Sequence, residues 1–411
     1  RHGRAQRGAG PQRGRHGTGW LRDALDQPPA GTPVLVLVAV IMFVCQLAGA
    51  NYAGVLSSGY YHTCGVFTDG SARCWGDNTT NQSRVPTSFT RFQIFSNNSA
   101  TNGSWSLLFN WNKDDNNGTI FNFTDPALGF WINGNITWEN VSSWRSISAG
   151  YSHTCGLTGE GVVLCWGQGK NYQSLLPQWV MGNASLEWRH VSAGTGHTCG
   201  VLMNGSAACW GANDEGQSTV PEGVEPWRQV DAGYAHSCGV TVNGSMYCWG
   251  WNGVTSGTLI PFGQASPPQI EGTWTAVSTG FVHSCGVSST GGGYCWGKND
   301  NGQTEVPSIL ELPSESTEPG SAITVSIQWR FIDASYFHTC GVTINGTVLC
   351  WGNNDAGQAS VPSFAGYKIL QVSTGFVHNC VVNASGGPTC WGPTPHGSKS
   401  YWFLGQTSAP G

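Results

Sequence analysis

The sequence has little charge, few methionines and no long apolar run. Only 10% of its 411 residues are charged and 4 are methionine, whereas charged residues make up about 25% of an average soluble domain. Glycine is abundant instead, with 59 residues, which favours a turn-rich β protein over a disordered chain. The sequence contains no nucleophile elbow, phosphate-binding loop, zinc-protease helix or kinase signature, so it indicates no enzyme class and no cofactor.

The amino-terminal region differs in composition from the rest. Residues 1–33 form a basic Arg/Gly/Pro-rich leader with six arginines and two aspartates, and they leave 18 − 6 = 12 basic against 23 − 2 = 21 acidic residues. This balance argues against a nucleic-acid partner. Residues 34–50 contain an apolar run of twelve, Val34 to Cys45, before Ala48-Gly49-Ala50. The run is short for a spanning helix and predicts a signal peptide, with an uncleaved signal anchor as the alternative.

One stretch, Asp333 to Pro362, contains the unit that the rest of the chain repeats. Its Asn345-Gly346 pair stands midway between Cys340 and Cys350 and is flanked by β-branched residues, which predicts a β-hairpin. A loop at residues 344–346 places the two cysteines opposite each other at a non-hydrogen-bonded pair, where Cα atoms lie about 4.5 Å apart. A disulfide tolerates that distance, so we expect one bridge within each repeat.

Seven copies of the unit carry two cysteines each, always ten positions apart, and a glycine follows every midpoint. The expected bridges are Cys64–Cys74, Cys155–Cys165, Cys199–Cys209, Cys238–Cys248, Cys285–Cys295, Cys340–Cys350 and Cys380–Cys390. The fifteenth cysteine, Cys45, lies in the predicted leader. Complete pairing of the others is typical of an oxidising compartment, and each bridge is worth about 2.5–3 kcal/mol on a loop-entropy estimate.

Two further positions recur in every copy. Trp-Gly follows the second cysteine, and we expect that tryptophan to pack between repeats. Histidine precedes the first cysteine by two residues, at His62, His153, His197, His236, His283, His338 and His378. We expect these histidines to be structural, each bonding the backbone, with a pH-sensing ring as the alternative.

The spacing of the copies predicts the fold. Repeats of about forty residues with three readable strands each, and a fourth expected near the Val-Pro ending, bury their faces only against neighbouring repeats. The predicted fold is therefore all-β, a seven-bladed β-propeller with one hairpin disulfide in each blade. We assign it residues 51–411, with a glycosylated insertion or a degraded blade at about residues 87–143.

The motifs resemble those of a known family. His-Thr-Cys-Gly-Val, Cys-Trp-Gly and Gly-x-Asn-x-x-Gly-Gln recur between Asn51 and Trp391, and they resemble the repeats of the regulator of chromosome condensation family. The paired cysteines make the chain look most like the secreted repeats in ectodomains of Crinkly-type receptor kinases. The resemblance implies a seven-bladed propeller used as a binding platform. It does not extend to nucleotide exchange, chromatin binding or a kinase domain, because the chain is acidic outside its leader and contains no kinase sequence.

Thirteen Asn-x-Ser/Thr sequons predict N-glycosylation. They are Asn78, Asn81, Asn97, Asn102, Asn117, Asn122, Asn135, Asn140, Asn183, Asn204, Asn243, Asn345 and Asn383. Six of them fall between Asn97 and Asn140, within the long gap before the second repeat. We expect that gap to carry glycans rather than to be buried.

At a few positions the residue types also suggest binding of a metal or a carbohydrate. The His-x-Cys pairs resemble zinc ligands, but opposed cysteines oxidise outside the cell, so we expect no metal. Asn299–Gly302 and Asn354–Gly357 resemble calcium loops but lack the closing glutamate, so we expect turns. Tryptophans of the gap offer stacking faces for a carbohydrate, and the candidate binding residues are Trp105, Trp111, Trp131 and Trp138.

The sequence therefore predicts a secreted or cell-surface glycoprotein without enzyme activity. Its expected role is a protein-binding or extracellular scaffold module with an extracellular protein or a glycan as partner. One alternative is the ligand-binding ectodomain of a receptor kinase whose membrane and kinase parts lie outside these residues. Another is a lectin-like propeller. Contact with a membrane is expected only through a signal anchor or a span outside these residues.

Overall fold

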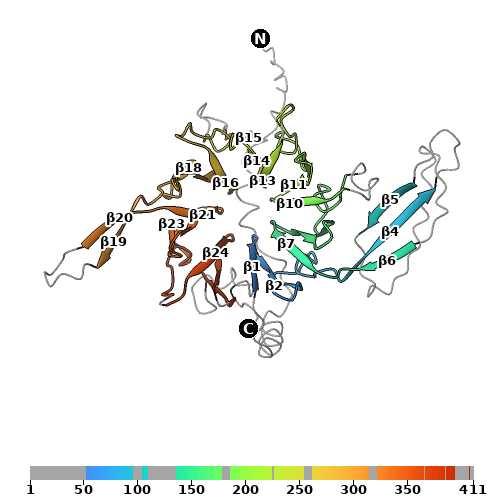
Figure 1. Ribbon diagram of the computed structural model, residues 1–411, viewed down its shortest axis with the longest axis horizontal. Coiled ribbons are helices and arrows are strands. Elements are labelled where there is room, and N and C mark those ends of the chain that lie inside the picture. The colour runs from blue at the N-terminus through green and yellow to red at the C-terminus, as the bar shows by residue number, and fades with distance from the viewer. Residues whose placement is uncertain are drawn as a thin grey trace, which may run out of the picture.

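The protein is an all-β ring of seven similar sheets around a central axis (Figure 1). The computed structural model describes residues 52–95, 104–109, 136–177, 186–224, 226–253, 262–313, 322–364, 366–384, 386–393 and 407. We number the sheets as blades 1 to 7. In chain order they are β1–β3 (Tyr52–Ser58, His62–Phe67, Ala72–Gly76), β7–β9 (Trp144–Ala149, His153–Thr158, Val163–Gly167), β10–β12 (Trp188–Ala193, His197–Leu202, Ala207–Gly211), β13–β15 (Trp227–Ala232, His236–Thr241, Met246–Gly250), β16–β18 (Trp274–Thr279, His283–Ser288, Gly293–Gly297), β21–β23 (Trp329–Ala334, His338–Thr343, Val348–Gly352) and β24–β26 (Ile369–Thr374, Asn379–Asn383, Pro388–Trp391).

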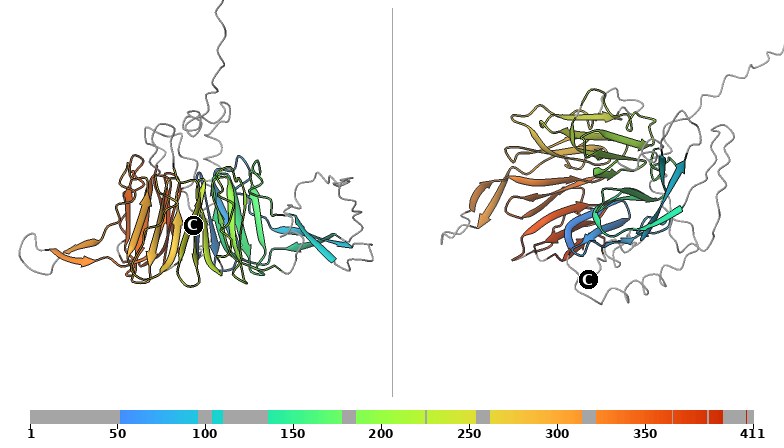
Figure 2. Two further views of the ribbon diagram at one scale, coloured as in Figure 1. Left: turned by 90° about the horizontal axis from the view of Figure 1, so that it is seen from above. Right: turned by 45° about the vertical axis from the view of Figure 1, so that its right-hand side comes forward.

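The blades close into a ring through their first strands. Each first strand contacts the first strand of the next blade, and β1 contacts both β7 and β24. Each blade is a three-stranded antiparallel sheet, so the fourth strand expected near the Val-Pro ending is absent from the described sheets. Seen from the side, the blades form a short cylinder (Figure 2). The predicted seven-bladed propeller is confirmed.

The hairpin register also agrees with the prediction. In blade 6, Cys340 lies opposite Cys350, and the Thr343 N–H donates to the Thr347 carbonyl at 2.9 Å. Gly346 takes a φ of +87°, a left-handed conformation that glycine adopts without steric cost. All seven predicted disulfides form, each with a Cα–Cα distance of 4.0 Å.

A tryptophan on the first strand explains the glycine of the Cys-Gly motif in blades 2 to 6. A Cβ on Gly239 would lie 2.5 Å from the indole of Trp227, and one on Gly200 would lie 2.5 Å from Trp188. The ring of Trp227 is fully buried over this glycine and also packs on Cys199 and Val201 of blade 3. The core thus lies between blades, as expected when each unit buries its faces against its neighbours.

Two further sheets project sideways from the ring (Figures 1 and 2). One contains β4 (Ser88–Phe95), β5 (Ser104–Phe109) and β6 (Ile136–Asn140), in the order β5-β4-β6. It lies outside the ring, since β1 contacts β7 directly, and it is therefore an insertion rather than an eighth blade. The other pairs β19 (Ile309–Pro313) with β20 (Ala322–Ser326) and accounts for the long spacing between blades 5 and 6.

Candidate functional site: the central channel and its aromatic end

A ring of seven buried histidines joins each blade to the next. Each Nε2 lies 2.7–2.9 Å from a side-chain oxygen of the following blade, and the ring closes from blade 7 to blade 1. The pairs are His62–Thr154, His153–Thr198, His197–Ser237, His236–Ser284, His283–Thr339, His338–Asn379 and His378–Thr63. The prediction that these histidines bond the backbone was wrong. Strand pairing already satisfies the nearby backbone, and the free partners are side chains across the blade interface.

The partners fix the histidine tautomer. Thr339 Oγ1 donates its proton to the Gln303 carbonyl at 2.8 Å, so it must accept from His283 Nε2. The same carbonyl accepts from the indole N–H of Trp351, which places the Cys-Trp-Gly tryptophan at the blade interface as expected. Burial lowers the pKa of His283 to about 3. The ring is therefore neutral near pH 7, which argues against its use as a sensor in that range.

A second ring of polar side chains lines the central channel. At one position per blade a serine or aspartate accepts a hydrogen bond from a backbone N–H of the next blade, at 2.6–3.1 Å. The acceptors are Ser57, Ser148, Ser192, Asp231, Ser278, Asp333 and Ser373. Buried polar groups of this kind are stabilising only when bonded, so the ring fixes the angle between blades as well as the polarity of the channel.

The two aspartates make more hydrogen bonds than the serines. Asp333 accepts from Ser278 of blade 5 at 3.0 Å, and from the N–H and hydroxyl of Thr374 of blade 7 at 2.6 and 2.9 Å. Asp231 links Ser192 and Thr279 in the same way. Burial raises the pKa of Asp333 to about 6, although the hydrogen bonds from Thr374 oppose that rise. Each carboxylate therefore links its own blade to the blades on both sides.

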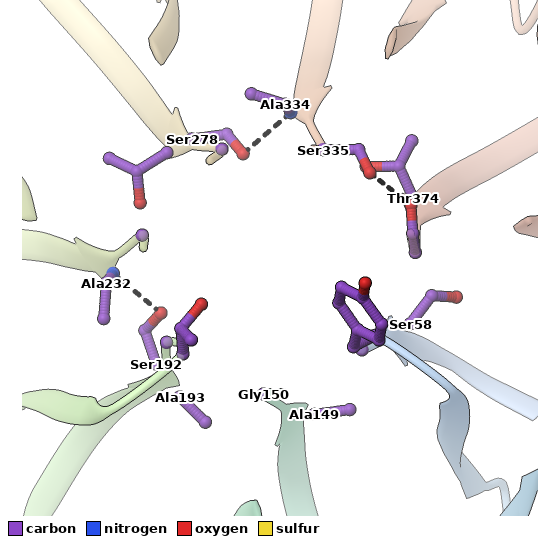
Figure 3. A pocket seen from close by; sticks show the side chains of 18 of the residues that line it. Ser58, Ala149, Gly150, Ser192, Ala193, Ala232, Ser278, Ala334, Ser335 and Thr374 are labelled. Atoms are coloured by element: carbon purple, nitrogen blue, oxygen red, sulfur yellow. Dashed lines mark hydrogen bonds between the residues drawn. The ribbon is translucent and has the colours of Figure 1, made fainter. Parts of the chain in front are cut away.

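The channel contains a cavity of about 130 Å³ lined mainly by small and polar residues. Figure 3 shows Ser58, Ser192 and Ser278 around it, with hydrogen bonds from Ala232 N–H to Ser192 and from Ala334 N–H to Ser278. The volume accommodates water molecules, which polar cavities of this size hold. Within the described residues, no three His, Cys, Asp or Glu side chains are grouped as metal ligands.

Aromatic residues close one end of this channel. Tyr60 is 2% exposed, and its ring lies 4.1 Å from Phe376, 4.2 Å from Tyr151 and 4.8 Å from Tyr336. The Tyr336 hydroxyl lies 3.1 Å from Thr195 Oγ1, so blades 3 and 6 meet across the axis. All four aromatic residues occupy the same position of the repeat, in the turn between the first and second strands. We call this side of the molecule the aromatic end.

The sequence analysis missed this site, although one recurring position of the repeat indicated it. An aromatic residue stands two positions before the histidine in six of the seven copies: Tyr60, Tyr151, Tyr234, Phe281, Tyr336 and Phe376. Within a single hairpin, an aromatic residue at this position has no evident role. It becomes a site only because the ring brings the six positions together.

The predicted glycosylation and binding residues are placed only in part. Asn78, Asn81, Asn140, Asn204, Asn243 and Asn345 are exposed, and Asn383 is partly exposed. Trp105 lies on β5 and Trp138 on β6 of the insertion. The remaining candidates lie outside the described residues, as does Cys45: Asn97, Asn102, Asn117, Asn122, Asn135, Asn183, Trp111 and Trp131.

Comparison with protein families agrees with the blade structure. A model of the regulator of chromosome condensation (RCC1) repeat matches residues 56–82, 144–173, 188–217, 227–255 and 329–358, which fall in five of the seven blades. The chain thus contains RCC1-type repeats within a propeller fold. None of the curated proteins compared with the chain matches it in sequence.

Solved structures share the fold of the RCC1-repeat propeller at low sequence identity. The entire ectodomain of the Physcomitrella patens receptor kinase CR4 is 17% identical, with a TM-score of 0.52 over 82% of this chain and 72% of that one. Prp20p of Saccharomyces cerevisiae, studied for its binding to Gsp1p and histones, is 14% identical, with a TM-score of 0.50 over 84% and 83%. The Crinkly WD40 ectodomain of the Arabidopsis thaliana receptor kinase ACR4 is 20% identical, with a TM-score of 0.48 over 84% and 96%.

Proposed function

We propose that this RCC1-repeat propeller is a secreted or cell-surface glycoprotein that acts as a non-catalytic binding scaffold. The observation that carries the proposal is the disulfide in every blade, with all fourteen cysteines of the blades paired. Such complete pairing is typical of oxidising compartments and rare in the cytosol and nucleus. It supports an extracellular role over a role like the histone binding studied for Prp20p.

The closed channel supports binding rather than catalysis. The side chains that line it are engaged in bonds between blades, as in the ring of serine and aspartate acceptors. A rigid ring of this kind presents loops at both ends, and binding tends to reside on loops that a rigid scaffold holds. The partner we propose is an extracellular protein or a glycan.

The ectodomain of a receptor kinase is a second candidate. The fold likeness to the CR4 ectodomain favours it. Among the described residues, no helix is long and apolar enough to cross a membrane. The deciding observation is the full transcript, where a downstream membrane span and kinase domain would favour a receptor over a secreted scaffold.

Secretion from a eukaryotic cell tests the proposal. Non-reducing peptide mass spectrometry should find the seven Cys-x9-Cys linkages, glycans on exposed sequons such as Asn204 and Asn345, and a new amino terminus near Asn51. An Asn204→Gln variant is the control, because it should lose one glycan and keep every linkage. Free thiols in a protein that remains inside the cell would refute the proposal.

A further inference from the structure

A continuous band of aromatic side chains runs across the aromatic end from the axis to the rim. We define the aromatic band as Tyr336, Phe281, Tyr234, Trp251 and Phe262, in that order. The ring centroids of successive members lie 5.1, 4.1, 6.2 and 5.9 Å apart. All five are partly exposed, so the band offers solvent a row of ring edges and faces supplied by blades 4, 5 and 6.

The loops around the band are acidic. At the aromatic end, the first eight residues after each third strand, where described, contain the acidic residues Asp77, Asp214, Glu215, Asp300, Glu305 and Asp355 against the basic residues Arg84, Lys170 and Lys298. Asp214 and Glu215 are exposed. Glu215 lies close enough to Tyr234 for its charge to help raise the pKa of that phenol, after the larger effect of burial. The band therefore borders two carboxylates, Asp214 and Glu215, that form no ion pair among the described residues.

The protein already binds one ammonium group on this surface. Lys298 Nζ lies 5.2 Å from the centroid of Phe262, the outer member of the band, and 2.9 Å from a carboxylate oxygen of Asp300. An aromatic face together with a carboxylate is the combination that favours a cation over water. Tyr234 and Glu215 repeat the pair of ring and carboxylate further along the band, and no lysine or arginine of the described residues forms an ion pair with Glu215.

The sequons on described loops and hairpin tips of the blades lie away from the band. Asn204, Asn243 and Asn345 lie at hairpin tips, at the opposite end of the strands from the aromatic turns. Asn78 and Asn81 do lie at the aromatic end, but in the loop after blade 1, which contacts Ser152 of blade 2. In a ring of seven, blades 1 and 2 lie across the axis from blades 4 and 5, so glycans there start far from the band.

We propose that the aromatic band with Asp214 and Glu215 is a docking surface for a cationic peptide segment of an extracellular partner. Lysine or arginine side chains of the partner lie over the band and pair with the carboxylates, as Lys298 does with Phe262 and Asp300. This inference rests on the proposed function and specifies the end of the ring, the residues and the chemistry of the partner.

Panning a random dodecapeptide display library against the secreted, glycosylated protein tests the surface. Enriched peptides are expected to be rich in Lys or Arg, and their affinity is then measured with synthetic copies by fluorescence anisotropy. Glu215→Gln should weaken binding about two- to fivefold, as loss of an exposed charge pair does. Tyr234→Leu keeps apolar volume but removes the ring, and it should weaken binding about tenfold, as loss of an interface aromatic does.

Glu187→Gln provides the matched control, since Glu187 is exposed beside a hairpin tip at the opposite end of the blades. It makes the same charge change and should leave the affinity unaltered. Thermal unfolding of each variant separates loss of binding from loss of fold. Peptides without basic enrichment, or basic peptides that bind Glu215→Gln and Tyr234→Leu as tightly as the parent, would overturn the inference and leave the secreted scaffold standing. Glycan-array binding abolished by Tyr234→Leu, without peptide enrichment, would also overturn it.

Discussion

Acidification should unfold the propeller, because its ring histidines must stay neutral to remain buried. Burial lowers the pKa of six of them to about 3 and that of His338 to about 4, whereas an exposed imidazole titrates near 6.5. The unfolded chain therefore binds protons that the native chain does not. The stability that these groups contribute is fully present above pH 6.5 and is lost as the pH falls towards 3.

The size of the effect follows from these values. At about pH 5, a shift from 6.5 to about 3 favours the unfolded state by roughly 2 kcal/mol for each histidine. Seven such groups lower the free energy of unfolding by about 14 kcal/mol, which is comparable with the whole stability of a typical domain. Near that pH, the histidines should take up nearly seven protons on unfolding, while Asp333, whose pKa burial raises to about 6, should release nearly one. The net uptake is then about six protons, a slope of roughly 8 kcal/mol per pH unit.

Equilibrium unfolding in urea with the disulfides intact measures this slope. Tryptophan fluorescence and near-ultraviolet circular dichroism should give the same transition at each pH between about 7.5 and 5, at constant ionic strength. A His283→Gln variant keeps an N–H donor towards Thr339 but no longer titrates, so its slope should fall by about one proton. Thr339→Val is the complementary control, since it should lower stability by about 1–3 kcal/mol without changing the slope.

A stability that is independent of pH across this range would refute the reasoning. So would an uptake of fewer than about three protons, because the linkage relation then requires native histidines with nearly normal pKa values. Either result would mean that water reaches the Nδ1 atoms, which have no hydrogen-bond partner among the described residues.

Two further predictions concern packing and the bridges. Gly239→Ala places a Cβ 2.5 Å from the Trp227 indole, and it should lower the free energy of unfolding by about 1–3 kcal/mol. Gly387→Ala, whose new Cβ would meet nothing closer than 3.7 Å, is its control in the same urea assay. Replacing Cys238 and Cys248 by alanine should cost about 2.5–3 kcal/mol with blade 4 still folded, measured as the shift in urea midpoint. An unchanged midpoint in either variant contradicts the corresponding packing or loop-entropy argument.

Most of the fold was predictable because its signals are local. The Asn345-Gly346 turn sets the register of its hairpin, and that register alone places Cys340 beside Cys350. Blade number followed from counting copies. The hairpin β19–β20 was not predicted, because nothing in a five-residue apolar stretch separates a strand of the ring from one that projects out of it.

The site was far less accessible to sequence reasoning. His62 and Thr154 are 92 positions apart, and His378 and Thr63 are 315 apart. The repeat showed that these residues recur, but recurrence does not tell which side chain meets which. The expected backbone bonds for the histidines were wrong for this reason, since the partner belongs to the neighbouring blade.

The sequence by itself determined the hairpins, their disulfides and the number of blades, because turn chemistry and a spacing of ten residues act within one repeat. Only the tertiary structure decided which residues of neighbouring blades contact one another. Ring closure turns one column of histidines into a neutral inter-blade ring and one column of serines and aspartates into a polar channel. It also joins Tyr234, Phe281 and Tyr336 of three blades into one surface. Contacts between repeats depend on the angle at which the blades pack, and the sequence of a single repeat does not specify that angle.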